Sequence, residues 1–367
     1  MRGKAMRRLT CLDGMRGVLA LYVMLSHILP FAVVPGWVAA AFAHGGAAVD
    51  AFFVLSGLVI VRSLPGFAGR AGAFLRARAA RIFPLYLLAL AAALAMRPWA
   101  HGIVAMPWIG PDSPAHVLVS DGWPEAVWAE IGAHLLMLHG LFPDGVALHL
   151  WVRFLGPAWS LSTEWQFYVL ALALAGWRLG SGRMALALLA LGVAGLGWHM
   201  LAGEAWQFSR AFLPNKAQYF ALGVASAALV AGGKRAVAVY LVVLVGVGAV
   251  SFDQGGLGKL AVPLGWSLCL GAELGWAAPL AGLLRLRALL WLGAISYPLY
   301  IAHEPIHKLL SIGLARLADG DAALFTALWL PAAILAPIGL AWWLHRAVEL
   351  PAQRWGKATR RLTPAPV

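Results

Sequence analysis

Long apolar runs separated by short polar segments are the feature that most limits how this chain can fold. A bilayer core about 30 Å thick is crossed by about 20 apolar helical residues, and runs of roughly this length recur along the whole chain. Only 12% of the residues are charged and 62% are hydrophobic, whereas soluble domains carry about 25% charged residues. We therefore predict an all-α, polytopic membrane helix bundle of about ten transmembrane helices, near residues 16–34, 46–62, 82–97, 160–177, 184–201, 217–233, 236–252, 259–277, 288–306 and 323–345.

The net charge of +13 is explained by where the cations lie, so it does not call for a nucleic-acid partner. With the N-terminus in the cytoplasm and the runs alternating, most Lys and Arg residues fall on one side, in segments 2–8, 62–81, 178–183, 234–235, 285–287 and 346–361. This is the positive-inside bias, and it predicts that both termini are cytoplasmic. We expect residues 1–350 to form one integral membrane domain and 351–367 a basic cytoplasmic tail, with membrane lipids as surroundings.

The first run, from Leu12 to Pro30, is almost wholly apolar apart from its ends, yet it carries Arg16 and His27. They are eleven positions apart, which is about three helical turns and about 16 Å along one face. If Arg16 lies at a membrane surface, His27 lies near the middle of the bilayer. An ionisable residue at that depth is costly, and it marks a functional site by default.

The second run contains Asp50 and the pair Ser56-Gly57. Asp50 at the helix start either compensates the helix dipole or orients and charges the imidazole of His27, because the first two spans are antiparallel neighbours. Ser56 and Gly57 are small residues that let helices approach closely. The alternative is that Gly57 leaves room for the narrow chain of a ligand.

The strongest cationic cluster precedes the third run. Arg78 and Arg81 are three positions apart and share a helix face. Such arginines anchor a helix to anionic lipid headgroups. The alternative is a clamp for the phosphates of a cytoplasmic nucleotide-bearing donor, because guanidinium groups bind phosphate in a bidentate manner.

The segment from about 98 to 158 is the longest outside loop and is richer in polar residues. A short helix over residues 131–142 would place His134 and His139 at the membrane surface. The His spacings in this loop do not resemble a metal site, and the two cysteines, Cys11 and Cys269, supply neither a disulfide framework nor a ligand set. We therefore expect no metal.

Two later runs are unusually polar. Ser160, Ser162 and Glu164 lie where the fourth span begins, so they either cap this helix or, with Tyr168, hold the hydroxyls of an acceptor.

The ninth span crowds together Tyr297, Tyr300, His303 and Glu304, and such a face either lines a cavity or satisfies buried partners. Glu273 lies at a cytoplasmic end and is expected to be solvated. Residues 349–351 are expected to end the last helix.

Six blocks of this sequence, in this order, resemble the acyltransferase 3 family of membrane O-acyltransferases. They are LDGMRGVLALYVMLSH, GGAAVDAFFVLSG, RARAARIFPLYLL, PAWSLSTEWQFY, ISYPLYIAHEPI and the closing ELP. Arg16 and His27 resemble the family's signature pair, and Arg78 and Arg81 its paired arginines. Ser56-Gly57 is similar to its Ser-Gly motif, although Leu58 stands where an aromatic residue is usual, and Trp165 follows Glu164 where an acid is more usual.

The resemblance implies transfer of an acyl group, often acetyl, from cytoplasmic acyl-CoA to a sugar or glycan hydroxyl at the outer face of the cytoplasmic membrane. An imidazole is a suitable base for that hydroxyl. Our hypothesis is direct transfer with His27 as general base, Asp50 in support and Arg16 holding the donor or a buried counter-charge. In this hypothesis Arg78, Arg81, Ser56 and Gly57 lie on the donor side, and Ser160, Glu164, Tyr168, Tyr297, Tyr300 and His303 on the acceptor side.

Two alternatives to this hypothesis stay open. An acyl-enzyme route through His27 or a serine would accomplish the same overall transfer. A different class of protein, a polytopic transporter or flippase of a lipid-linked sugar or small solute, would also contain ionisable residues within its spans.

Overall fold

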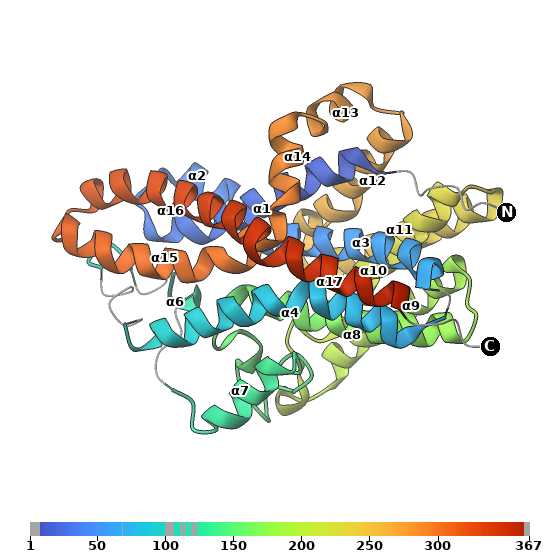
Figure 1. Cartoon of the computed structure of the whole chain (residues 1–367), viewed down its shortest axis with the longest axis horizontal. Coiled ribbons are helices and arrows are strands. Elements are labelled where there is room, and N and C mark those ends of the chain that lie inside the picture. The colour runs from blue at the N-terminus through green and yellow to red at the C-terminus, as the bar shows by residue number, and fades with distance from the viewer. Residues whose placement is uncertain are drawn as a thin grey trace.

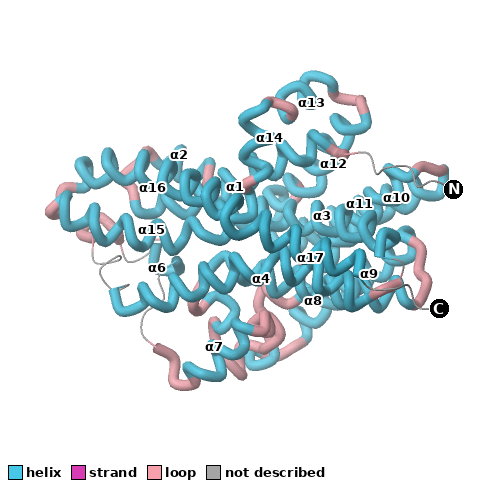
Figure 2. Tube along the Cα trace, viewed as in Figure 1, coloured by secondary structure: helices cyan, strands magenta, loops and turns pink. Residues whose placement is uncertain are grey.

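The computed structural model describes residues 8–67, 69–99, 106–110, 113, 115–118 and 123–362. Within these ranges the protein is helical throughout, with no strand beyond an isolated bridge between Pro143 and Phe208 (Figure 2). The N-terminal half contains α1 (Thr10–Ile28), η1 (Leu29–Phe31), α2 (Gly36–Ala41), α3 (Gly45–Ser63), η2 (Leu64–Phe67), α4 (Ala71–Met96), η3 (Arg97–Trp99), α6 (Ala115–Leu118), α7 (Val127–Leu135), η4 (Leu150–Val152), η5 (Gly156–Ala158) and α8 (Trp159–Gly176). The C-terminal half contains α9 (Ser181–Leu201), η6 (Glu204–Trp206), η7 (Leu213–Asn215), α10 (Ala217–Ala231), α11 (Lys234–Lys259), α12 (Ala261–Leu274), α13 (Ala278–Leu284), α14 (Arg287–Ala294), α15 (Ser296–Ala318), α16 (Ala322–Leu344), η8 (His345–Glu349) and α17 (Leu350–Leu362).

A helix occupies each of the ten predicted ranges, and six helical segments are long and apolar enough to cross a membrane. A seventh candidate is the pair α12 and α13, which is bent by 95°. Helices α8 and α15 are not among the six, because they carry the polar side chains of the predicted site. The count of ten spans and the cytoplasmic side of both termini stay predictions. The terminal residues 1–7 and 363–367 lie outside the part of the chain that the structure describes.

Several predicted boundaries are wrong. The range 288–306 is broken at Ile295, where the short helix α14 ends and α15 begins and continues to Ala318. The sequence predicts a helix over 131–142, but the helix in this region is α7, which begins earlier, at Val127, and ends at Leu135. The last helix does not end at residues 349–351, since the π-helical turn η8 carries it into α17, where Pro351 is tolerated in the first turn.

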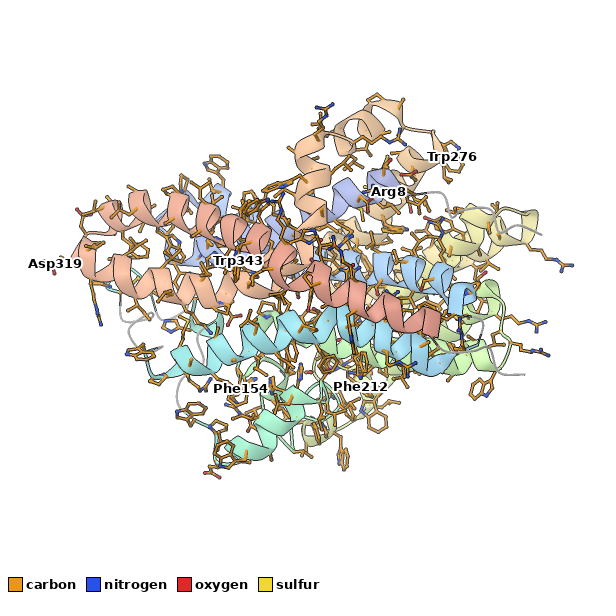
Figure 3. The ribbon with its side chains drawn as sticks, viewed as in Figure 1. Arg8, Phe154, Phe212, Trp276, Asp319 and Trp343 are labelled. Carbon is orange, nitrogen blue, oxygen red and sulfur yellow. The ribbon has the colours of Figure 1, made fainter. Side chains whose placement is uncertain are left out.

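Figure 1 shows α3, α4, α15, α16 and α17 running along the long axis of the molecule, with α13 and α14 projecting from one side and α7 from the other. The turn between α15 and α16 lies at one end of this axis, where Asp319 is labelled in Figure 3. Helix α16 is tied to α1 because the indole of Trp329 donates a hydrogen bond to the carbonyl oxygen of Ile28, at 2.9 Å. It is tied to α15 by His307, whose Nε2 donates to the carbonyl oxygen of Ala333.

Helices α3 and α10 pack with their backbones close together. A methyl group added at Gly57 would overlap the carbonyl oxygen of Phe220, and one added at Gly223 would overlap that of Val54. This contact between small residues is the packing typical of membrane helices. Gly57 therefore serves helix packing, and the alternative that it leaves room for a ligand is wrong, because the space beside it is filled by α10.

We expect Gly57→Ala to lower the free energy of unfolding by about 1–3 kcal/mol, since the added methyl group overpacks the contact between α3 and α10. Gly339→Ala in α16 is the matched control, because its added methyl group meets nothing within 4 Å. Thermal unfolding of the detergent-solubilised protein, followed by tryptophan fluorescence, measures both. Equal melting temperatures for the two variants would contradict the packing role.

Candidate active site

Two cavities follow one another inside the bundle. The first, which we name the arginine cavity, has a volume of about 150 Å³, and its polar lining is Arg16, Ser56, Arg78, Arg81, Ser160, Glu164, Tyr168, Ser296, Tyr297 and Tyr300. The second, the histidine cavity, has a volume of about 140 Å³ and is lined by Val23, His27, Gly45, Gly46, Val49, Trp151, Val152, Gly156, Pro157, Trp159, Arg210, Tyr300, Glu304 and Lys308. Val49 and Tyr300 line both cavities.

The order of the lining residues along each helix shows how the cavities are arranged. On α1, Arg16 lines the arginine cavity, whereas Val23 and His27 line the histidine cavity. On α15 the lining passes in the same way from Tyr297 to Glu304, through the shared Tyr300. The two cavities therefore lie in succession along the helix axes, with Val49 and Tyr300 as their common wall.

The arginine cavity brings three guanidinium groups together around one carboxylate. Arg16 donates a hydrogen bond from Nη2 to Ser296 Oγ at 2.9 Å, and the guanidinium of Arg78 lies 5.4 Å from the ring centre of Phe74. Arg78 Nε is buried and has no hydrogen-bond partner among the described residues. Arg81 completes the set. Because three cations face a single Glu164, the cavity is suited to an anionic ligand.

Glu164 does not cap a helix. The N-cap of α8 is Ala158, and none of Ser160, Ser162 and Glu164 makes a capping hydrogen bond. Instead Glu164 Oε1 accepts hydrogen bonds from Ser56 Oγ at 2.7 Å and from the hydroxyl of Tyr168. These contacts join α3 to α8 and hold the carboxylate at the cavity wall.

The predicted tyrosines of α15 both line the arginine cavity and satisfy buried partners, so each of the two open alternatives holds in part. The hydroxyl of Tyr297 donates to the carbonyl oxygen of Ile82 at 2.6 Å. The hydroxyl of Tyr300 lies 2.8 Å from Ser160 Oγ and donates to the carbonyl oxygen of Pro157 at 3.0 Å. Tyr300 is thereby fixed between the two cavities.

His27 is hydrogen-bonded to a second histidine. Its Nδ1 lies 2.6 Å from His303 Nε2, and His303 Nδ1 lies 3.1 Å from the carbonyl oxygen of Leu299. A carbonyl oxygen only accepts, so in neutral His303 the proton is on Nδ1 and Nε2 carries the lone pair. His27 must then donate from Nδ1, which leaves its Nε2 unprotonated. That tautomer is the one a general base needs.

Asp50 is not the partner of His27, and this expectation is corrected by the structure. Asp50 is fully buried, with its carboxylate 2.6 Å from Lys216 Nζ and 3.4 Å from Lys259 Nζ. Lys216 stands at the start of α10, and the break of α11 at Gly255 and Gly256 brings Lys259 within reach. The carboxylate is therefore compensated by lysines, and its place beside His27 is taken by His303.

Other side chains of the site were not predicted from the sequence. Lys216, Lys259 and Arg210 come from segments that meet α3 only in the folded protein. The sequence around each of them contains no motif that would identify it as part of a site. Glu304 pairs with Lys308 at 2.6 Å, an i,i+4 spacing that is visible in the sequence. Among the described residues no group of three His, Cys, Asp or Glu side chains is placed to hold a metal ion.

The model of the family described as "Acyltransferase domain" matches residues 9–346. The chain belongs to the acyltransferase 3 family. A protein of Rhizobium radiobacter described as "Protein 2 in picA locus" is similar to it, with 33% identity over 171 residues, which cover 43% of this chain and 77% of that protein. No solved structure matches the chain. As an acyltransferase-family chain built from several apolar helices, it is a multi-pass membrane protein.

Outside the predicted spans, two buried histidines are stacked on each other. The rings of His134 and His139 lie 4.3 Å apart between centres and are nearly parallel. Burial lowers the pKa of His134 to about 4 and holds the pKa of His139 well below its usual range. Phe154, labelled in Figure 3, packs edge-on against His134.

This pair predicts a loss of stability in acid. A histidine with a lowered folded-state pKa takes up its proton more readily when unfolded, so stability is full above about pH 6.5 and falls as the pH drops toward 4. For His134 alone the loss at pH 5 is about 2 kcal/mol. Melting temperatures measured from pH 7.5 to 5 should fall more steeply in the wild type than in the His134→Gln/His139→Gln variant. Parallel curves would contradict the assignment.

Proposed function

We propose that this protein is an acyl-CoA-dependent O-acyltransferase of the cytoplasmic membrane. It moves an acyl group, acetyl in the simplest case, from cytoplasmic acyl-CoA to a hydroxyl of a sugar or glycan at the extracytoplasmic side. The observation that carries the proposal is the succession of the two cavities, one with three arginines and the next with an imidazole whose Nε2 is unprotonated.

The donor occupies the arginine cavity in this proposal. CoA carries phosphate groups on a long flexible arm that ends in the thioester, and Arg16, Arg78 and Arg81 supply guanidinium groups for anions. Arg78 Nε makes no hydrogen bond to the described residues, so not all the donors of this guanidinium are used within the protein. The thioester then reaches the common wall formed by Val49 and Tyr300.

The acceptor enters the histidine cavity from the opposite side. His27 Nε2 takes the proton of its hydroxyl while the oxygen attacks the acyl carbon of the thioester. The new C–O ester bond forms as the C–S bond breaks, and the proton held by His27 passes to the leaving CoA thiolate to give the free thiol. His303 does not touch either substrate in this scheme; it is a positioning residue that fixes the tautomer of His27.

Family membership favours an acyltransferase over the transporter alternative. A transporter built on the same helices would consume no acyl-CoA. The acyl-enzyme route differs in another way, since it would leave labelled acyl groups on the protein when no acceptor is present.

The first test is the turnover of acetyl-CoA by protein purified into lipid nanodiscs, with a mixture of cell-envelope glycans as acceptor. We expect His27→Gln to lower the rate of ester formation by about 100-fold or more, because general base catalysis contributes on that scale. His199→Gln replaces an exposed histidine outside both cavities and should retain wild-type turnover. Acetyl-CoA consumption that is absent from the wild type, or unchanged in His27→Gln, would overturn the proposal.

The second test concerns the role of His303. His303→Leu removes the acceptor for the Nδ1 proton of His27, so we expect kcat to fall about 10-fold or more, as when a catalytic imidazole loses its orienting partner. His303→Gln offers an amide oxygen in its place and should recover part of the rate, with the KM for acetyl-CoA unchanged in both variants. A purely structural role would instead give equal losses in both variants and a lowered melting temperature.

A further inference from the structure

The histidine cavity holds more positive than negative charge. Its own lining contains Arg210, Lys308 and Glu304, of which Lys308 and Glu304 pair with each other. Behind Trp159 lies the group formed by Asp50 and its two lysines, which carries one cation more than it has carboxylates. Among the residues that the structure describes, Arg210 and one lysine of the buried group therefore have no matching carboxylate.

Arg210 is held at the cavity by two indole rings. Its guanidinium carbon lies 5.3 Å from the ring centre of Trp151 and 5.9 Å from that of Trp159. One of its terminal nitrogens lies 3.7 Å from the position of a methyl group added at Gly46, at the first turn of α3. Arg210 is exposed and has no carboxylate within ion-pair distance among the residues that the structure describes. Cation–π contacts orient the group without neutralising it.

The same cavity presents aromatic surface beside His27. Trp151 and Trp159 lie edge to face with their ring centres 6.4 Å apart, and both line the cavity. Indole rings combine a large apolar area with restricted geometry, which suits them to packing against a rigid ring that has polar substituents. A saccharide ring of this kind, carrying a negative group for Arg210 and a hydroxyl for His27, would match the unpaired charge, the indole surface and the imidazole of the cavity.

We propose that the acceptor is an anionic saccharide, whose carboxylate or phosphate binds Arg210 while a hydroxyl of the same molecule faces His27. This inference rests on the proposed function, because it names the substrate class for that site. The guanidinium group binds either anion through paired hydrogen bonds. Arg210 thereby selects charged over neutral glycans before any chemistry occurs.

The test measures binding without acyl-CoA, using the full chain in nanodiscs of zwitterionic phosphatidylcholine so that no anionic lipid competes. The probes are trigalacturonate and its neutral methyl ester, and maltotriose with and without a terminal phosphate. Isothermal titration calorimetry gives the dissociation constants for wild type, Arg210→Gln and Arg316→Gln. The last is the matched control, since Arg316 is an exposed arginine that lines neither cavity.

We expect at least one anionic probe to bind the wild type about 10-fold more tightly than its neutral counterpart, as for a charge-assisted bidentate contact. Arg210→Gln should abolish this preference, and Arg316→Gln should keep it. A preference for trigalacturonate alone identifies a uronate acceptor, and one for the phosphorylated probe alone identifies a sugar phosphate. Equal binding of charged and neutral probes, a preference that survives Arg210→Gln, or no binding of any probe would each overturn the inference.

The failure of this inference and that of the proposed function are read from different measurements. Acetyl-CoA consumption with the same four probes reports on the acyltransferase activity. A charge preference in binding without any consumption would overturn the proposed function, and the anion site would stand. Suppose instead that acetyl-CoA is consumed with a neutral probe and that charged and neutral probes bind equally. The proposed acyltransferase function would then stand, and the proposed anion site at Arg210 would be overturned.

Discussion

The hydrogen bond between His27 and His303 is the interaction on which the arrangement of the site depends. A polar side chain inside an apolar bundle cannot form hydrogen bonds with water, so its hydrogen-bond partner must come from another helix. His27 on α1 finds that partner on α15, 276 positions away in the sequence. The same requirement joins Ser56 to Glu164, Ser160 to Tyr300 and Asp50 to Lys216. Each contact fixes how two segments pack, and together they leave the arginine cavity between α1, α3, α4, α8 and α15. The histidine cavity lies between α1, α3, α15 and the segments that carry Trp151 and Arg210.

The choice of a neutral partner for His27 has a chemical consequence. A carboxylate at that position would favour the imidazolium form, which has no lone pair with which to take a proton. His303 is held by the Leu299 carbonyl in the tautomer that only accepts at Nε2, so it orients His27 without charging it. Asp50, the buried carboxylate nearest to His27 along the chain among the described residues, is instead compensated by Lys216 at the N-cap of α10 and by Lys259 of α11. Different groups therefore perform the two tasks: His303 orients the imidazole of His27, and the lysines compensate the charge of Asp50.

The sequence predicted what depends on local periodicity and left open what depends on packing. Each apolar run contains a helix, although the run 288–306 is divided between α14 and α15. Spacing alone predicted that Arg16 and His27 lie three turns apart, and they line successive cavities. The partner of His27 was not predictable, because neighbouring antiparallel spans pointed to Asp50 while the contact depends on where α15 packs. Glu273 was expected to be solvated, yet it is buried and accepts a hydrogen bond from the backbone of Cys11. That error arises because the end of α12 packs against the first turn of α1, a contact between distant segments that apolar content does not reveal.

Tyr300 belongs to the wall between the two cavities, which is where the proposed donor and acceptor would meet. Its hydroxyl is held by Ser160 and by the carbonyl oxygen of Pro157, and its ring centre lies 6.0 Å from that of Phe52 and 6.4 Å from that of His303. In the proposed reaction the thioester would approach this wall from the arginine cavity and the hydroxyl from the histidine cavity, so neither substrate would have to cross the bundle. Direct transfer needs the two reacting atoms within about 3–3.5 Å of each other. A side chain that stands between the two substrates keeps their reacting atoms farther apart than this, so the proposed direct transfer requires an opening beside Val49 and Tyr300. A wall that stays closed would require a covalent carrier between the cavities.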